Sequence, residues 1–123
     1  MNTQSKDVLK TEQTKNIYKE FPKNFTLTKQ QVKDFCKKWQ ITEFSLFGSV
    51  LRDDFAKDSD VDILVTFAPQ AKHSLLDLVH IKAELQQLLS RKVDVLTKKS
   101  VQASHNWLRK EQILSTAQVI YVS

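Results

Sequence analysis

The residues best suited to chemistry in this 123-residue chain are one glycine and a few aspartates. Gly48 is the only glycine, and it ends an apolar run and precedes Ser49. After ten intervening residues, Asp60 and Asp62 begin a second apolar run. Because glycine lacks a Cβ, it allows the backbone to turn sharply or to approach a ligand closely. The spacing therefore predicts a phosphate-binding turn that faces a pair of metal-binding carboxylates.

The two acids of the Asp60-x-Asp62 pair are two residues apart at the head of a predicted strand, so their side chains project from the same face. Two carboxylates on one face repel each other, and a bound cation offsets that cost. Mg²⁺ prefers oxygen ligands and is usually held by one or two carboxylates together with substrate phosphates. Asp94 interrupts a further apolar strand. If that strand lies beside the first, the three aspartates converge and suit two Mg²⁺ ions, one for the attacking oxygen and one for the leaving oxygen.

The turn at Gly48 and Ser49 forms the other half of the predicted site. A short helix that begins near Ser49 would direct its free backbone N–H groups at a phosphate, and the Ser49 hydroxyl would add a donor. Arg52 would add a positively charged fork for phosphate oxygens. These residues together indicate a nucleoside triphosphate bound with Mg²⁺. The chain contains no Gly-x-x-x-x-Gly-Lys-Ser/Thr run, so it is not a P-loop protein.

Helices and strands must position these residues, and the hydrophobic pattern predicts both. Helices are predicted over residues 28–39, 74–90 and 105–117, the first two opened by the capping boxes Thr28-x-x-Gln31 and Ser74-x-x-Asp77. Strands are predicted over residues 43–47, 61–67, 93–96 and 119–122. Trp39 and Trp107 lie on apolar helix stripes and are predicted to be core residues. This order of elements predicts an α/β fold in which helices cover a sheet.

Composition and charge restrict the class of protein further. The chain is 41% hydrophobic and 27% charged, which is typical of one small globular domain. Its net charge of +5 resides in residues 1–40, which hold nine lysines against four acids. Apart from Lys37-Lys38, these lysines are spaced singly, and no arginine or aromatic stripe accompanies them, so we expect a solvated surface rather than a nucleic-acid interface. The single cysteine and the absence of an apolar run of about 20 residues predict a cytoplasmic protein without a membrane partner.

At these residues the chain resembles the minimal nucleotidyltransferases of the DNA polymerase β superfamily, whose signature is Gly-Ser, ten residues and Asp-x-Asp. Gly48-Ser49 and Asp60-Val61-Asp62 fit that spacing, and Asp94 fits the third carboxylate of the family. The resemblance implies that residues 28–123 form a nucleotidyltransferase domain and that residues 1–27 are a lysine-rich N-terminal appendage. The stretches around both motifs are similar to the antitoxin branch, whose members are partners of HEPN-domain ribonuclease toxins.

The resemblance implies a small mixed β-sheet flanked by helices, the palm-like fold of polymerase β. It also implies Mg²⁺-dependent transfer of AMP from ATP to a hydroxyl, with release of pyrophosphate. In the antitoxin branch the acceptor is a tyrosine of the toxin, which we expect the adjacent gene to encode. The implied roles are metal binding for Asp60 and Asp62, metal binding and proton acceptance for Asp94, and binding of the β- and γ-phosphates for Gly48 and Ser49.

One departure from the family pattern concerns Arg52. Many relatives have Arg-Gly at this point, whereas this chain has Arg52-Asp53, which places an acid near the phosphates. An acid at this position would offset part of the Arg52 charge that is predicted to bind phosphate.

Other functions remain open at this point. The chain could silence a toxin by covering it, without catalysis, or it could transfer a nucleotide to the hydroxyl of a small molecule. The second alternative requires a further domain or subunit, because the predicted helices and strands leave little chain to bind such a molecule. A basic nucleic-acid-binding protein is the third alternative, and only the N-terminal lysines support it.

Overall fold

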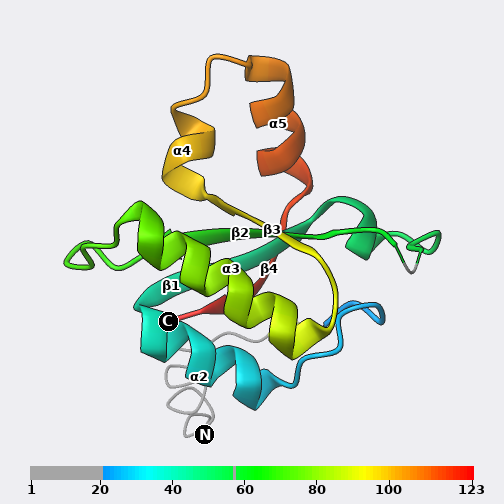
Figure 1. The fold of residues 1–123 in the computed structure, drawn as a ribbon. Coiled ribbons are helices and arrows are strands. Elements are labelled where there is room, and N and C mark those ends of the chain that lie inside the picture. Colours follow the sequence, from blue (N-terminus) through cyan, green and yellow to red (C-terminus); the bar gives the residue numbers. More distant parts are fainter. Residues whose placement is uncertain (1–20, 57) are drawn as a thin grey trace, which may run out of the picture.

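A computed structural model describes residues 21–56 and 58–123 of the chain (Figure 1). The elements follow in the order α2 (Lys29–Trp39), β1 (Ile41–Phe47), the 3₁₀ helix η1 (Gly48–Leu51), β2 (Val61–Phe67), α3 (Leu75–Leu89), β3 (Val93–Thr97), α4 (Lys98–Gln102), α5 (Trp107–Thr116) and β4 (Gln118–Val122). The first 20 residues of the predicted lysine-rich appendage lie outside the described residues.

The four strands form one mixed sheet in the order β3-β2-β1-β4. Strand β1 pairs antiparallel with both β2 and β4, whereas β2 and β3 are parallel. Parallel neighbours require a long crossover connection, and α3 supplies it between β2 and β3. The structure thus confirms the predicted small mixed sheet flanked by helices.

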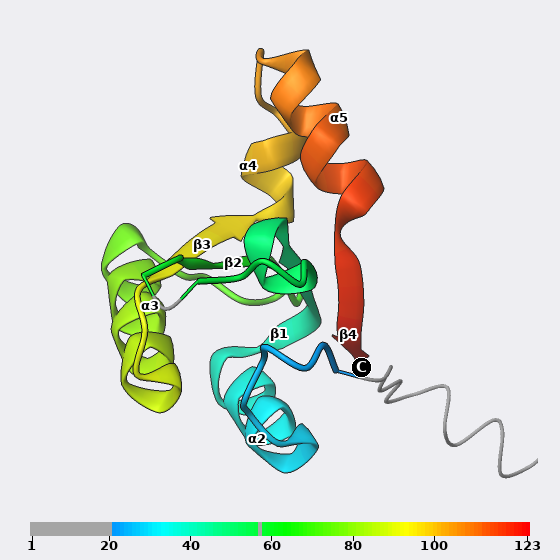
Figure 2. The same cartoon turned by 90° about the vertical axis from the view of Figure 1, so that its right-hand side faces the viewer.

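Helices α2 and α3 cover one face of the sheet, as Figures 1 and 2 show. Both predicted capping boxes are present, at Thr28 and at Ser74, and they fix where these helices begin. The two helices direct apolar side chains into the main core against alternate residues of β1 and β2. This core includes Val32, Phe35, Phe44, Leu46, Ile63, Val65, Ile81 and Leu85.

Helices α4 and α5 stand on the opposite face of the sheet (Figure 2). A smaller core lies beneath them and consists of Phe47, Leu64, Val101 and Ile113. Because side chains alternate along a strand, the residues of β2 that flank Leu64 at a spacing of two face the same helices. Asp62 is one of these residues, so the predicted site must lie on the α4–α5 side of the sheet.

Trp107 is not a core residue, and the prediction for it was wrong. Its side chain is 65% exposed, and that of the neighbouring Leu108 is 66% exposed. The start of α5 lies farthest from the sheet (Figure 1), so only its later turns, around Ile113, reach the small core. Trp39, by contrast, is half-buried and packs against the main core.

No helix among residues 21–56 and 58–123 is long and apolar enough to cross a bilayer.

Candidate active site

The turn at Gly48 brings the phosphate half of the predicted site against the metal half. Strand β1 ends at Phe47, and η1 begins at Gly48, where the backbone φ is +77°. A Cβ on Gly48 would overlap Oδ2 of Asp62 and lie 3.2 Å from its Cγ. The predicted short helix near Ser49 is therefore present, and the glycine is required because the Asp62 carboxylate occupies the space of a side chain.

Pairing of the strands places Asp62 at the centre of the site. In the parallel pair of β2 and β3, Asp62 is the register partner of Asp94. In the antiparallel pair of β1 and β2, it is the partner of Phe47, the residue before Gly48. Asp60 is exposed and directly precedes β2. The condition set above, that the Asp94 strand lies beside the strand headed by Asp60 and Asp62, is thus met.

The three aspartates form an electrostatically unfavourable group. The pKa of Asp62 is raised to about 6, first by burial and then by the negative charges of Asp94 and Asp60. The positive charge of Arg109 acts in the opposite direction and lowers this pKa. A cation near Asp62 would therefore favour its ionised form.

The side chains near Asp62 supply the type of ligand atom that a magnesium site requires. Carboxylate oxygens are the ligands that Mg²⁺ prefers, and the mutual repulsion at Asp62 is the condition that a divalent cation relieves. However, no three carboxylate, imidazole or thiol side chains in the described part of the chain are gathered closely enough to hold a metal ion. The three aspartates are neighbours in the sheet, but their carboxylates do not converge on one metal position. Mg²⁺ coordination therefore stays a prediction.

The raised pKa of Asp62 predicts how stability depends on pH in the absence of metal. Because the folded pKa is about 6 and the ordinary value is 3.8, the folded state holds the proton more tightly than the unfolded state between these values. Wild-type stability should therefore fall as pH rises from about 4 to 6. The Asp62→Asn variant lacks this loss, and we expect its Tm to exceed that of wild type by roughly 5 °C at pH 7 and by much less at pH 4. Thermal unfolding of both proteins in EDTA across this range measures the difference, and a Tm gap independent of pH would contradict it.

A cavity of about 370 Å³ lies beside the Gly48 turn. This volume falls in the range typical of small-molecule sites, about 300–1,000 Å³. One wall comes from β1, η1 and β2 and the other from α5; the lining residues are Phe47, Gly48, Leu51, Arg52, Asp62, Arg109, Gln112, Ile113 and Thr116. Gly48, Arg52 and Asp62, predicted from separate motifs, thus border one cavity. Ser49, Asp60 and Asp94 are not among its lining residues: Ser49 follows Gly48, Asp60 lies two residues before Asp62, and Asp94 is the register partner of Asp62.

Arg52 borders the cavity but is already engaged in an ion pair. Its Nε lies 3.2 Å from Oδ1 of Asp54, and both side chains are largely exposed. Asp53, the acid that departs from the family pattern, forms an ion pair of 3.3 Å with Lys23 at the surface. The Arg52 charge is therefore shared with Asp54 and is not fully available to a ligand.

Two residues outside the motifs hold the loop that joins the two halves of the site. The side-chain amide of Asn24 donates hydrogen bonds to the backbone carbonyls of Val50 and Arg52, at 3.2 and 2.8 Å. The guanidinium of Arg91 donates to two backbone carbonyls just before Asp60 and lies over the Phe55 ring. These contacts fix both ends of the loop. The hydrogen bonds among them could not be predicted from the sequence, because their acceptors are backbone carbonyls.

Arg109 is a charged residue of the cavity that the sequence motifs did not predict. It belongs to a face of α5 on which Arg109, Gln112 and Thr116 recur at the spacing of helical turns and line the cavity. This polar spacing could have indicated a second wall of the site. The neighbouring Trp107 and Leu108 instead suggested that the first turn of α5 packs in the core.

Comparison with known proteins agrees with this geometry. Residues 28–120 match the family model described as a nucleotidyltransferase domain, which covers most of the chain. The chain therefore belongs to the nucleotidyltransferase domain family, and it is a nucleotidyltransferase. The family match begins at residue 28, although Phe25 and Leu27 are also buried in the main core. The boundary at residue 28 thus stays a prediction.

Two curated relatives are named as protein adenylyltransferases. One, from Methanocaldococcus jannaschii, bears the name "Putative protein adenylyltransferase MJ0435" and is 39% identical over 76% of this chain and 95% of the relative. The other, "Protein adenylyltransferase MntA" from Thermococcus cleftensis, is 35% identical over 58% of this chain and 70% of the relative.

Solved structures share the fold at lower sequence identity. A crystal structure of a toxin–antitoxin with AMP-PNP matches with a TM-score of 0.62 and 17% identity, over 79% of this chain and 75% of that chain. A structure of a tri-AMPylated HEPN toxin from Shewanella oneidensis in complex with an MNT antitoxin matches with a TM-score of 0.54 and 17% identity, over 76% and 69%. At this identity the likeness shows that the fold is shared.

Proposed function

We propose that this chain is an antitoxin that transfers AMP from ATP to a tyrosine hydroxyl of a HEPN-domain ribonuclease toxin and thereby silences it. The observation that carries the proposal is the contact between the Gly48 turn and the Asp62 carboxylate at the wall of one cavity. The names of the adenylyltransferase relatives and the shared fold with toxin–antitoxin structures support the same activity. The partner toxin is expected to be encoded by the adjacent gene.

The proposed reaction is an in-line displacement at the α-phosphorus of ATP. The acceptor oxygen forms a bond to this phosphorus, and the bond from phosphorus to the bridging oxygen of the β-phosphate breaks. Pyrophosphate leaves with that electron pair, and the hydroxyl proton passes to a carboxylate. In this scheme Gly48 and Ser49 bind the β- and γ-phosphates and so orient the α-phosphorus toward the acceptor.

The carboxylates supply both metal binding and proton acceptance in this scheme. Asp60, Asp62 and Asp94 would hold up to two Mg²⁺ ions, which neutralise phosphate charge and polarise the reacting oxygens. Asp94 lies half-buried opposite Asp62 in the sheet, and it is the base proposed to accept the acceptor proton. Its place on β3 is compatible with an acceptor that approaches along the edge of the sheet.

The surface near the cavity supports a protein as the acceptor. Trp107 and Leu108 are exposed at the start of α5 and directly precede Arg109, which lines the cavity. Exposed aromatic and aliphatic side chains of this kind are typical of surfaces that contact another protein. A toxin bound there would have its acceptor hydroxyl close to the nucleotide.

A second candidate function is neutralisation of the toxin by binding alone. The exposed apolar side chains of Trp107 and Leu108 favour it, because such a surface can cover a partner without catalysis. The two functions are separated by assaying ribonuclease activity of the adjacent-gene toxin after incubation with ATP, Mg²⁺ and either wild type or the Asp60→Asn, Asp62→Asn double variant, followed by removal of the antitoxin. Our proposal predicts that the toxin stays inactive after wild type and recovers after the double variant. Full recovery in both cases would establish binding alone.

A further inference from the structure

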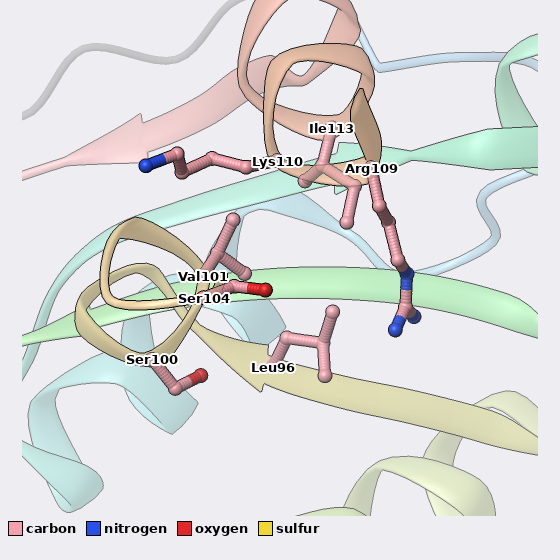
Figure 3. A pocket seen from close by; sticks show the side chains of 7 residues that line it. All are labelled: Leu96, Ser100, Val101, Ser104, Arg109, Lys110 and Ile113. Atoms are coloured by element: carbon pink, nitrogen blue, oxygen red, sulfur yellow. The ribbon is translucent and has the colours of Figure 1, made fainter. Parts of the chain in front are cut away.

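One face of α5 forms the wall of the cavity opposite the Gly48 turn. Arg109, Gln112, Ile113 and Thr116 occupy this face, and Ile113 anchors it to the sheet through the small core. Figure 3 shows the Arg109 side chain extending from α5 toward the strands, whereas the Lys110 side chain points sideways and away from Arg109. Arg109 also borders a smaller cavity of about 120 Å³ between α4, α5 and β3.

The positive charge of Arg109 acts on the nearby Asp62 carboxylate, but no described residue holds the guanidinium in place. The backbone N–H of Arg109 helps to begin α5 by donating to Asn106, but its guanidinium forms neither an ion pair nor a hydrogen bond with another described residue. The other cation that lines the cavity, Arg52, is paired with Asp54. The nearby Lys110 donates to the backbone carbonyl of Gln102 at 3.3 Å. Within the described residues, Arg109 is therefore the cavity cation with all of its donors available.

A nucleoside triphosphate would meet strong repulsion in this cavity without such a cation. Asp62 lines the cavity, and the negative charges of Asp60 and Asp94 act on Asp62. A nucleoside triphosphate bound in the cavity would therefore lie near three carboxylates. A guanidinium presents several N–H donors in a planar fork that matches phosphate oxygens. Arg109 can thus offset the repulsion and orient the phosphates at the same time.

We propose that Arg109 is a substrate-binding residue that contacts the phosphates of the nucleotide from the side opposite the Gly48 turn. This inference rests on the proposed function for the identity of the ligand as ATP. It assigns the nucleotide a two-sided pocket, with the backbone of η1 on one side and the guanidinium from α5 on the other. The C-terminal helices then belong to the active site rather than serving only to cover the sheet.

The test measures nucleotide affinity directly, without an acceptor, in wild type and in Arg109→Gln, Arg109→Lys and Lys110→Gln. Dissociation constants for ATP, AMP and adenosine in the presence of Mg²⁺ are obtained by titration calorimetry, and thermal unfolding shows that each variant is folded. Loss of a charged hydrogen bond predicts that Arg109→Gln binds ATP about 10- to 100-fold more weakly. Arg109→Lys should retain part of the affinity, and Lys110→Gln, the matched charge removal one residue away, should bind like wild type. Adenosine affinity should be unchanged in all of them.

Two results would overturn this inference. One is an ATP affinity of Arg109→Gln equal to that of Lys110→Gln, which would leave Arg109 outside the site. The other is an equal loss of ATP and adenosine affinity, which would show that Arg109 only maintains the cavity. If wild type binds ATP but transfers no AMP to the toxin, the proposed function fails and the role of Arg109 is still decided by these affinities.

Discussion

Replacing Asp62 by asparagine is expected to reduce AMP transfer at least about 100-fold while leaving the domain folded. Among the described residues, Asp62 is the only carboxylate that lines the cavity. It contacts the Gly48 turn, and Asp94 is its register partner on the neighbouring strand. Asparagine keeps the size of the side chain but removes the charge that a metal ion requires. Transfer of labelled AMP to the toxin, measured under single-turnover conditions, gives the rate.

The matched control for this variant is Asp58→Asn. Asp58 is an exposed acid two residues before Asp60, and the same chemical change there should leave the transfer rate near that of wild type. Removing a carboxylate that is destabilised by burial and by its neighbours also predicts that Asp62→Asn is more stable than wild type above pH 6. Turnover by Asp62→Asn at the wild-type rate would remove Asp62 from the mechanism.

Replacing Gly48 by alanine is the second change with a large expected effect. The new Cβ would overlap Oδ2 of Asp62, so the carboxylate must leave its position beside the turn. We expect a loss of transfer of at least about 100-fold, similar to that of Asp62→Asn, because the two halves of the site no longer fit together. The positive φ adds a loss of stability of about 1–2 kcal/mol, measurable by denaturant unfolding.

Gly48→Asn separates steric overlap from backbone strain. Gln40 and Ser90 adopt φ values of 57° and 54° with side chains in place, so a positive φ alone does not demand glycine in this fold. Asparagine tolerates this conformation better than alanine does, yet it carries the same Cβ. We therefore expect Gly48→Asn to be more stable than Gly48→Ala and equally poor in transfer. Activity of the asparagine variant near wild type would show that strain, and not the contact with Asp62, explains the glycine.

The sequence predicted those candidate site residues whose type is unfavourable in the local sequence around them. A single glycine at the end of an apolar run and carboxylates inside apolar strands are costly unless a ligand needs them, so Gly48, Asp62 and Asp94 could be identified. The register that places Asp62 opposite Asp94 depends on strand order, which the local pattern does not determine, so the sequence could offer their proximity only as a condition. Capping boxes predicted α2 and α3 well because the cap residues act on neighbouring backbone atoms.

The remainder depends on contacts between distant parts of the chain. Helix α4 has only five residues, too few to show a helical period. Arg91 and Asn24 act on backbone carbonyls, which any sequence provides. Arg109 belongs to a helix whose first turn looks apolar because of Trp107 and Leu108, and its position at the cavity depends on how α5 packs against the sheet. Periodicity identified this helix correctly but could not tell which of its turns reach the core.

Mass spectrometry of the toxin encoded by the adjacent gene, after incubation with this protein, ATP and Mg²⁺, decides whether AMP is transferred. We expect the toxin to gain the mass of one or more AMP groups, fragmentation to place them on tyrosine, and no mass to be gained with Asp62→Asn. We also expect that α-labelled ATP transfers its label, whereas γ-labelled ATP releases it as pyrophosphate. A toxin that binds this protein and is silenced by it, yet gains no AMP, would contradict the proposed function.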